Sequence, residues 1–179
     1  MSELGFKQLT IDNWLTPDQV SSIFARFDSE GNTHEISGEE WLQDILKPQL
    51  LDTVPKDVKA LFEVSRSAMA YGYFFYPLYT LACEQLYRVI ESAVSYKCKL
   101  LGAPQKIMGN FEAKIKFLIA NSVISEAENL RWDGIRGLRN IASHPEMQSL
   151  GLPTNALSTL ERCTSIINLL FENKINGNN

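Results

Sequence analysis

The sequence predicts an all-α protein with a core of four helices preceded by an acidic helical segment. Apolar residues recur at helical spacing along most of the chain, and the alternation typical of strands is almost absent. Capping boxes and a first-turn proline mark several helix starts. The length of 179 residues, with 45% hydrophobic and 21% charged residues, fits one soluble globular domain with room for an appendage.

Residues 1–70 are expected to form an acidic extension of short helices. The first helix is predicted to begin at TPDQ (16–19), which combines a cap, a first-turn proline and a capping-box partner. A second begins at the capping box SGEE (37–40) and stops before Pro48, and a third covers residues 56–69. This extension holds six Lys and Arg against twelve Asp and Glu, so an anionic partner would avoid it.

Residues 71–175 are expected to contain the four core helices. The first is long and lies within YPLYTLACEQLYRVIESAVSYKCKLLG, where helical spacing persists for more than four turns and Gly102 can serve as the C-cap. A shorter second helix lies in NFEAKIKFLIANSV. The aromatic run YGYFFYPLY before the long helix could stack on bases, but it lacks interleaved Lys or Arg, which favours a core or interface position.

The third and fourth core helices flank the candidate site. A capping box at Ser125 begins the third helix, which is expected to reach His144 and to end there because the residue before Pro145 avoids the helical region. The fourth helix covers about residues 153–172. The remaining tail, residues 176–179, is expected to fray.

The composition argues against several classes of protein. No run approaches 18 consecutive apolar residues, and the N-terminus lacks a basic region followed by an apolar one, so we expect a cytoplasmic protein without a membrane span. Three separated cysteines, two histidines and no CxxC pair make a zinc site improbable. The stretch FDSEGNTHEISGEEW resembles a calcium loop, but the sixth position from Asp28 is Thr33 instead of glycine. We therefore expect no metal and no other cofactor.

The candidate site lies in GLRNIASHPE, residues 137–146. On an α-helix, Arg139 and His144 are about 140° apart around the axis and ~7.5 Å apart along it, so the two do not share a stripe. The negative end of the helix dipole favours a charged His144, which could act as general acid and base on RNA, while Arg139 could bind the phosphate. The polar face of this helix consists of Arg136, Arg139, Asn140, Ser143 and His144.

Three points about the same region stay open. So short a motif also arises by chance, and the alternative is a helix end completed by polar residues. Residues 71–147 carry nine Lys and Arg against seven Asp and Glu, which is weak evidence for a nucleic-acid partner. Gly134 and Gly137 are unusual inside a helix, and a close approach by a neighbouring helix, including one from a second subunit, would explain them.

The segment from Arg139 to His144 resembles the R-x(4–6)-H motif of the HEPN family, in which a polar residue often follows the arginine. The long helix LACEQLYRVIESAVSYKCKLLG is similar to the first core helix of that family, and the resemblance covers about residues 71–175. It implies an up-and-down four-helix bundle with the motif near the end of its third helix. Many members are metal-independent endoribonucleases, often toxins or defence proteins, and they usually form homodimers that bring two motifs into one cleft.

The resemblance also implies roles for individual residues. Arg139 and His144 correspond to the catalytic pair and Asn140 to the supporting polar residue, with Arg136 and Ser143 beside them. An acid on the first core helix often lies near the arginine; Glu84 is the candidate, and Glu91 is the alternative. Some branches of the family have lost catalysis, so the alternative function is a binding module for a nucleotide or for a partner such as a nucleotidyltransferase-type antitoxin.

Overall fold

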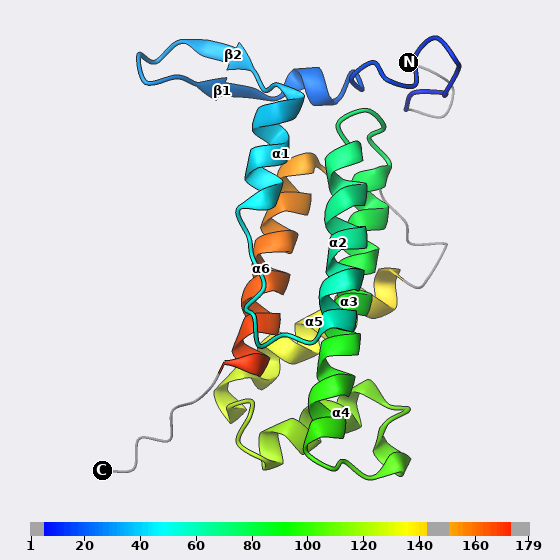
Figure 1. Cartoon of the computed structure of the whole chain (residues 1–179), viewed down its shortest axis with the longest axis vertical. Coiled ribbons are helices and arrows are strands. Elements are labelled where there is room, and N and C mark those ends of the chain that lie inside the picture. Colours follow the sequence, from blue (N-terminus) through cyan, green and yellow to red (C-terminus); the bar gives the residue numbers. More distant parts are fainter. Residues whose placement is uncertain (1–5, 143–150, 173–179) are drawn as a thin grey trace.

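The computed structural model describes residues 6–142 and 151–172. Within these ranges the chain is mostly helical, with one small hairpin, and the predicted all-α class is confirmed (Figure 1). No helix in the described ranges is long and apolar enough to cross a membrane. The elements are β1 (Ala25–Phe27), β2 (Thr33–Glu35), α1 (Gly38–Leu46), α2 (Lys56–Tyr71), α3 (Leu78–Leu100), α4 (Phe111–Ala120), α5 (Asn129–Ala142) and α6 (Pro153–Phe171).

The core is organised around α3, which packs against α2 on one side and α6 on another, while α1 covers α2 and α6. The Ser65 hydroxyl of α2 donates to the carbonyl of Ala82 in α3 at 2.6 Å, which fixes the two helices closely. The boundary predicted after residue 70 falls inside the last turn of α2, and buried side chains on both sides of it share one core. The largest buried side chains include Phe62, Met69, Tyr79, Leu86, Ile90, Leu118, Leu160, Ile167 and Leu170.

The helices α3 and α6 run parallel to each other. Near their starts the backbone N–H of Gly151 donates to the Thr80 hydroxyl at 3.1 Å, and near their ends the Tyr96 and Phe171 rings pack with centroids 6.4 Å apart. Four helices that alternate in direction would instead place the first and the last antiparallel. The order α3, α4, α5, α6 therefore does not alternate strictly.

The short helix α4 explains this arrangement. Its ten residues span ~15 Å, whereas the 23 residues of α3 span ~35 Å, so α4 cannot return along α3. It stays at the C-terminal end of α3, and α5 then crosses α3 on the way back (Figure 1). The turn out of α3 follows the sequence prediction, because Gly102 has a positive φ of 71° and Ala103 N–H bonds to the carbonyl of Cys98.

The N-terminal extension differs from the prediction. The helix expected from residue 16 is replaced by a 3-10 turn (Ser21–Ile23) and the β1–β2 hairpin, because the Asp18 side chain is used elsewhere. Its carboxylate accepts N–H bonds from Val20 at 3.1 Å and from Tyr76 at 3.0 Å, and it is buried against the α2–α3 turn. The residues that resemble a helix start therefore anchor the N-terminal extension to the α2–α3 turn and do not begin a helix.

The hairpin turn explains the resemblance to a calcium loop. The Asp28 carboxylate accepts the backbone N–H groups of Glu30 and Asn32 at 2.8 and 2.9 Å. Hydrogen bonds from Asn32 lower the pKa of Asp28 below its usual value. Gly31 supplies the positive φ of 86° that the turn requires. The acidic and glycine residues of this stretch thus close a tight turn.

The aromatic run YGYFFYPLY (residues 71–79) joins α2 to α3, and part of it lies in the core, which is one of the two positions that the sequence favoured. Tyr76 and Tyr79 are buried, and Trp41 of α1 meets Tyr79 edge to face at 5.7 Å. Gly72 is required here, since a Cβ at this position would lie 2.6 Å from the Tyr79 ring. Burial raises the pKa of the Tyr79 hydroxyl. These aromatic side chains therefore have a structural role.

Candidate functional site

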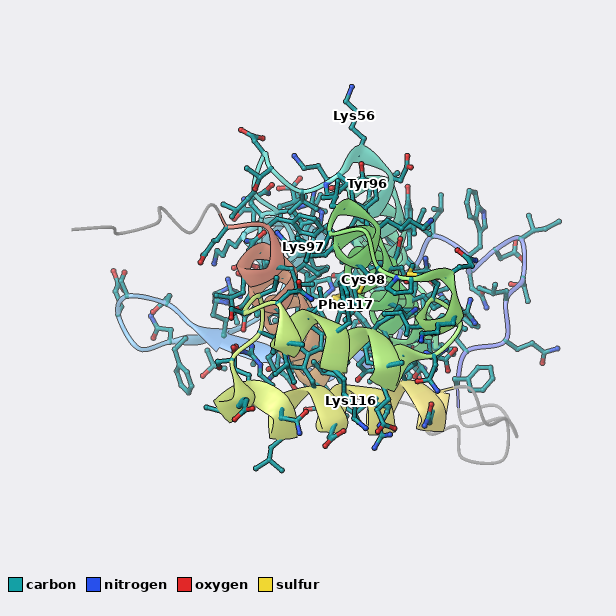
Figure 2. The ribbon with its side chains drawn as sticks, turned by 90° about the horizontal axis from the view of Figure 1, so that it is seen from below. Lys56, Tyr96, Lys97, Cys98, Lys116 and Phe117 are labelled. Atoms are coloured by element: carbon teal, nitrogen blue, oxygen red, sulfur yellow. The ribbon has the colours of Figure 1, made fainter. Side chains whose placement is uncertain are left out.

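The candidate site lies where the last turn of α5 meets α3 and α4. Figure 2 views this end of the molecule, with α4 and α5 side by side in the foreground and the labelled Lys116 on the side of α4 toward α5. The first half of α5 lines a small hollow with α6, which includes Trp132 and Ile166. The second half carries Arg139 to the middle of α3.

Arg139 is held by Glu91. Its Nε donates to Glu91 Oε2 at 2.7 Å, and both side chains are about one-third exposed. A charge-assisted bond of this length fixes the orientation of the guanidinium. Arg139 Cζ also lies 5.9 Å from the centre of the Phe111 ring of α4. Arg139 is therefore oriented by two other helices and is still partly open to solvent.

The second oxygen of Glu91 faces a buried lysine. Lys114 of α4 is 3% exposed, its Nζ lies 3.5 Å from Glu91 Oε1, and it donates to the Ser95 hydroxyl oxygen at 2.9 Å. The Lys114 Nζ lies 5.9 Å from the Phe111 ring. We call Glu91, Ser95, Phe111, Lys114 and Arg139 the arginine cluster.

The other predicted site residues fall in different places. Arg136 lies one turn before Arg139 and pairs with Glu112 at 2.6 Å and with Asp133 at 3.3 Å, and Asn140 is exposed next to the arginine cluster. Hydrogen bonds and charge from Lys116, followed by Arg136, lower the pKa of Glu112. Ser143 and His144, predicted respectively as a supporting and a catalytic residue, lie outside the described residues.

Of the two candidate acids, Glu91 pairs with Arg139. Glu84 lies two turns earlier on α3 and is half-buried. Periodicity could not separate them, because residues seven apart share one face of a helix. Which of the two acids meets Arg139 depends on where α5 crosses α3, and this crossing is a feature of the tertiary structure.

Lys114 was not among the site residues predicted from the sequence. Its neighbours on the same face of α4 are Phe111, Ile115 and Leu118, all buried, so the lysine interrupts an apolar stripe at positions i, i+3, i+4 and i+7. A lysine at a core position needs partners for its charge. That interruption was the available signal for the arginine cluster.

The outer face of α5 is open. Leu130 is 84% exposed and Leu138 is also exposed, and a Cβ added at Gly134 or Gly137 would meet nothing within 4 Å. The close helix expected against the two glycines is therefore absent from the described part of this single chain. The face formed by Leu130, Gly134, Gly137 and Leu138 lies on the same helix as the arginine cluster.

A second hollow lies between α1 and α2. It has a volume of about 670 Å³, and mostly apolar side chains line it. Leu42 and Leu46 come from α1, Tyr71 ends α2, and the charged residues in its lining are Glu39, Glu63 and Arg66. We call this hollow the α1–α2 groove.

Two further findings bear on the site. Within residues 6–142 and 151–172, no group of three or more His, Cys, Asp or Glu side chains could hold a metal ion. The chain matches no protein-family model, no curated protein and no solved structure. The arginine cluster is therefore the feature of this chain that bears on its function.

Proposed function

We propose that this protein is a metal-independent endoribonuclease of the HEPN type. The observation that carries the proposal is the ion pair between Arg139 and Glu91, which orients a partly exposed guanidinium five residues before His144. Arginine binds phosphate through a planar fork of donors, so an oriented arginine is suited to a phosphodiester. The acid on α3 beside the motif arginine agrees with the family pattern.

In the proposed reaction the 2′-OH attacks the adjacent phosphorus and the bond to the 5′-oxygen breaks. The products are a 2′,3′-cyclic phosphate and a 5′-hydroxyl. His144 takes the proton from the 2′-OH and delivers a proton to the leaving 5′-oxygen. Arg139 stabilises the charge that develops on the phosphate, and Asn140 supports the phosphate. Glu91 positions Arg139 and does not touch substrate.

The proposal includes a HEPN-like four-helix core made of α3, α4, α5 and α6. In that interpretation α4 is a shortened second helix, and the parallel course of α3 and α6 follows from its length. The arginine of the motif would then lie on the third of the four helices. The chemistry of the arginine cluster supports the proposal more strongly than the topology does.

The proposal also includes a homodimer formed through the outer face of α5. Exposed Leu130 and Leu138 offer apolar surface, and Gly134 and Gly137 leave room for a second helix to approach. Such a dimer would place the two α5 helices next to each other, while each Arg139 faces the α3 helix of its own chain. Mass measurement in solution for wild type and Leu130→Glu tests it, since the charged variant should be monomeric.

Cleavage of unstructured RNA in EDTA tests the enzymatic proposal directly. Wild type should cut and leave 2′,3′-cyclic phosphate ends, and His144→Ala should lose the activity while keeping its helical circular dichroism. Intact RNA after incubation with wild type would overturn the proposal. An unchanged rate in His144→Ala would overturn the assignment of the base.

A second candidate function is a non-catalytic module that binds a partner protein, such as a nucleotidyltransferase-type antitoxin. The α1–α2 groove favours it, because two antiparallel helices with an apolar floor can receive the apolar face of a partner helix. Glu39 would suit a basic residue beside that face, whereas Glu63 already pairs with Arg66. In this case expression should not arrest growth, and Leu42→Glu should abolish co-purification of a stoichiometric partner that wild type retains.

A further inference from the structure

The buried Lys114 is not explained by packing. It occupies a core position on α4 among the buried residues Phe111, Ile115 and Leu118. Burying an ammonium group is costly unless the charge is paired and hydrogen-bonded. Its partners are the Ser95 hydroxyl at 2.9 Å and Glu91 Oε1 at the longer distance of 3.5 Å. Because well-packed apolar residues often replace a buried ion pair without loss of stability, a role beyond packing is expected for this lysine.

The position of Lys114 changes the charge felt at Arg139. Glu91 directs Oε2 to Arg139 and Oε1 to Lys114, so one carboxylate is shared between two cations. The formal charges of the three groups leave one positive charge in excess. With Lys114 removed, the formal charges of Glu91 and Arg139 would cancel each other, and the attraction of the arginine cluster for an anion would weaken.

We propose that Lys114 is a positioning residue that acts through Glu91 to keep a net positive charge at Arg139, and that it thereby sets the affinity of the site for a phosphodiester of single-stranded RNA. This inference rests on the proposed ribonuclease function for the identity of the ligand. It assigns separate tasks to Glu91 and Lys114: Glu91 orients Arg139, and Lys114 compensates the charge of Glu91.

Three variants separate these tasks. Lys114→Met removes the buried charge with little change in shape, and Glu91→Gln removes the negative charge while keeping an acceptor for Arg139. Lys116→Met is the matched control, because it removes the same charge from the same helix at a side chain that is 73% exposed and pairs with Glu112. Thermal unfolding of each variant checks that the fold is retained.

The experiment measures binding of a fluorescent RNA in which every 2′-oxygen is methylated, so that cleavage cannot occur, across a series of salt concentrations. Lys114→Met should bind about fivefold more weakly, the effect of ~1 kcal/mol from one lost charge, and should lower the slope of log affinity against log salt by about 0.7. Glu91→Gln should bind more tightly than wild type. With cleavable RNA, Lys114→Met should raise KM and keep kcat, while Glu91→Gln should lower kcat.

Each outcome decides one of the two proposals. Binding by Lys114→Met equal to that of Lys116→Met would overturn the role of Lys114, whatever the cleavage assay gives. Wild type that binds the methylated RNA with the expected variant order, but leaves cleavable RNA intact, would overturn the ribonuclease proposal and support the role of Lys114. Wild type that binds no RNA at low salt would overturn the phosphodiester site itself.

Discussion

The arginine cluster and the α1–α2 groove present opposite chemistry to a ligand. In the arginine cluster, charged side chains from α3, α4 and α5 are partly or fully buried and are paired with one another before any ligand arrives. In the α1–α2 groove the floor is apolar, and the Arg66 guanidinium in its lining is already satisfied by Glu63 at 2.6 Å. The first region is suited to orient a phosphate and the second to bury an apolar surface. The first therefore carries the proposed reaction, and the second is the basis of the rival function.

Replacing Arg139 should have the largest effect, and that effect should be on RNA cleavage by the arginine cluster. Arg139→Ala removes the group proposed to stabilise the transition state, so kcat/KM for RNA cleavage should fall by about 10³-fold. Arg131→Ala, an exposed arginine on the same helix, is the control and should cleave like wild type. Equal rates in the two variants would show that α5 has no catalytic arginine at position 139.

Removing the shared carboxylate should have the next largest effect, this time on stability. Glu91→Ala leaves the buried Lys114 without its ion-pair partner, and the free energy of unfolding in urea should fall by about 3 kcal/mol. Glu84→Ala should cost less than ~1 kcal/mol. A larger loss for Glu84→Ala would mean that the acid first predicted from the sequence is the important one.

A charged substitution in the α1–α2 groove should leave RNA cleavage unaffected. Leu42 is exposed and lies on a different helix pair from the arginine cluster, so RNA cleavage by Leu42→Glu should stay within about twofold of wild type. Val64→Glu, at an exposed position of α2 outside the groove, is its control. A cleavage defect confined to Leu42→Glu would show that the two regions are coupled.

The smallest effect concerns the thiols. Burial raises the pKa of Cys83 to about 11 and that of Cys163 to about 12. Because the folded thiols hold their protons more firmly than unfolded ones, the free energy of unfolding should fall as pH rises above about 9. Iodoacetamide should label both slowly at pH 8 in the native protein and quickly in urea. Rapid native labelling of Cys163 would contradict its burial next to α3.

Local patterns in the sequence predicted most of the helices. Capping boxes at Ser37 and Ser125 and the glycine after α3 act where expected, because caps depend on neighbouring residues alone. The pattern at residue 16 was wrong, because Asp18 bonds to Tyr76, which is far away in the sequence. The alternation of helix directions also failed, since it depended on the length of α4.

The candidate site, like the fold, was predicted where it depends on neighbouring residues and not where it depends on tertiary contacts. The sequence indicated Arg139 and Asn140 because both lie in one short motif. The choice of Glu91 over Glu84 and the presence of Lys114 could not be derived, because they depend on how α4 and α5 cross α3. The spacing of apolar residues along one helix does not give the position at which that helix crosses another.

The central claim is that the arginine cluster serves cleavage by a neighbouring 2′-OH. The most direct measurement uses an RNA that is 2′-O-methylated at every position except one and incubates it with wild type in EDTA. The account predicts a single cut on the 3′ side of the unmodified nucleotide, with a 2′,3′-cyclic phosphate on one product and a 5′-hydroxyl on the other. An uncut substrate would contradict it when the corresponding unmodified RNA is also left intact, as would a cut that leaves a 3′-hydroxyl.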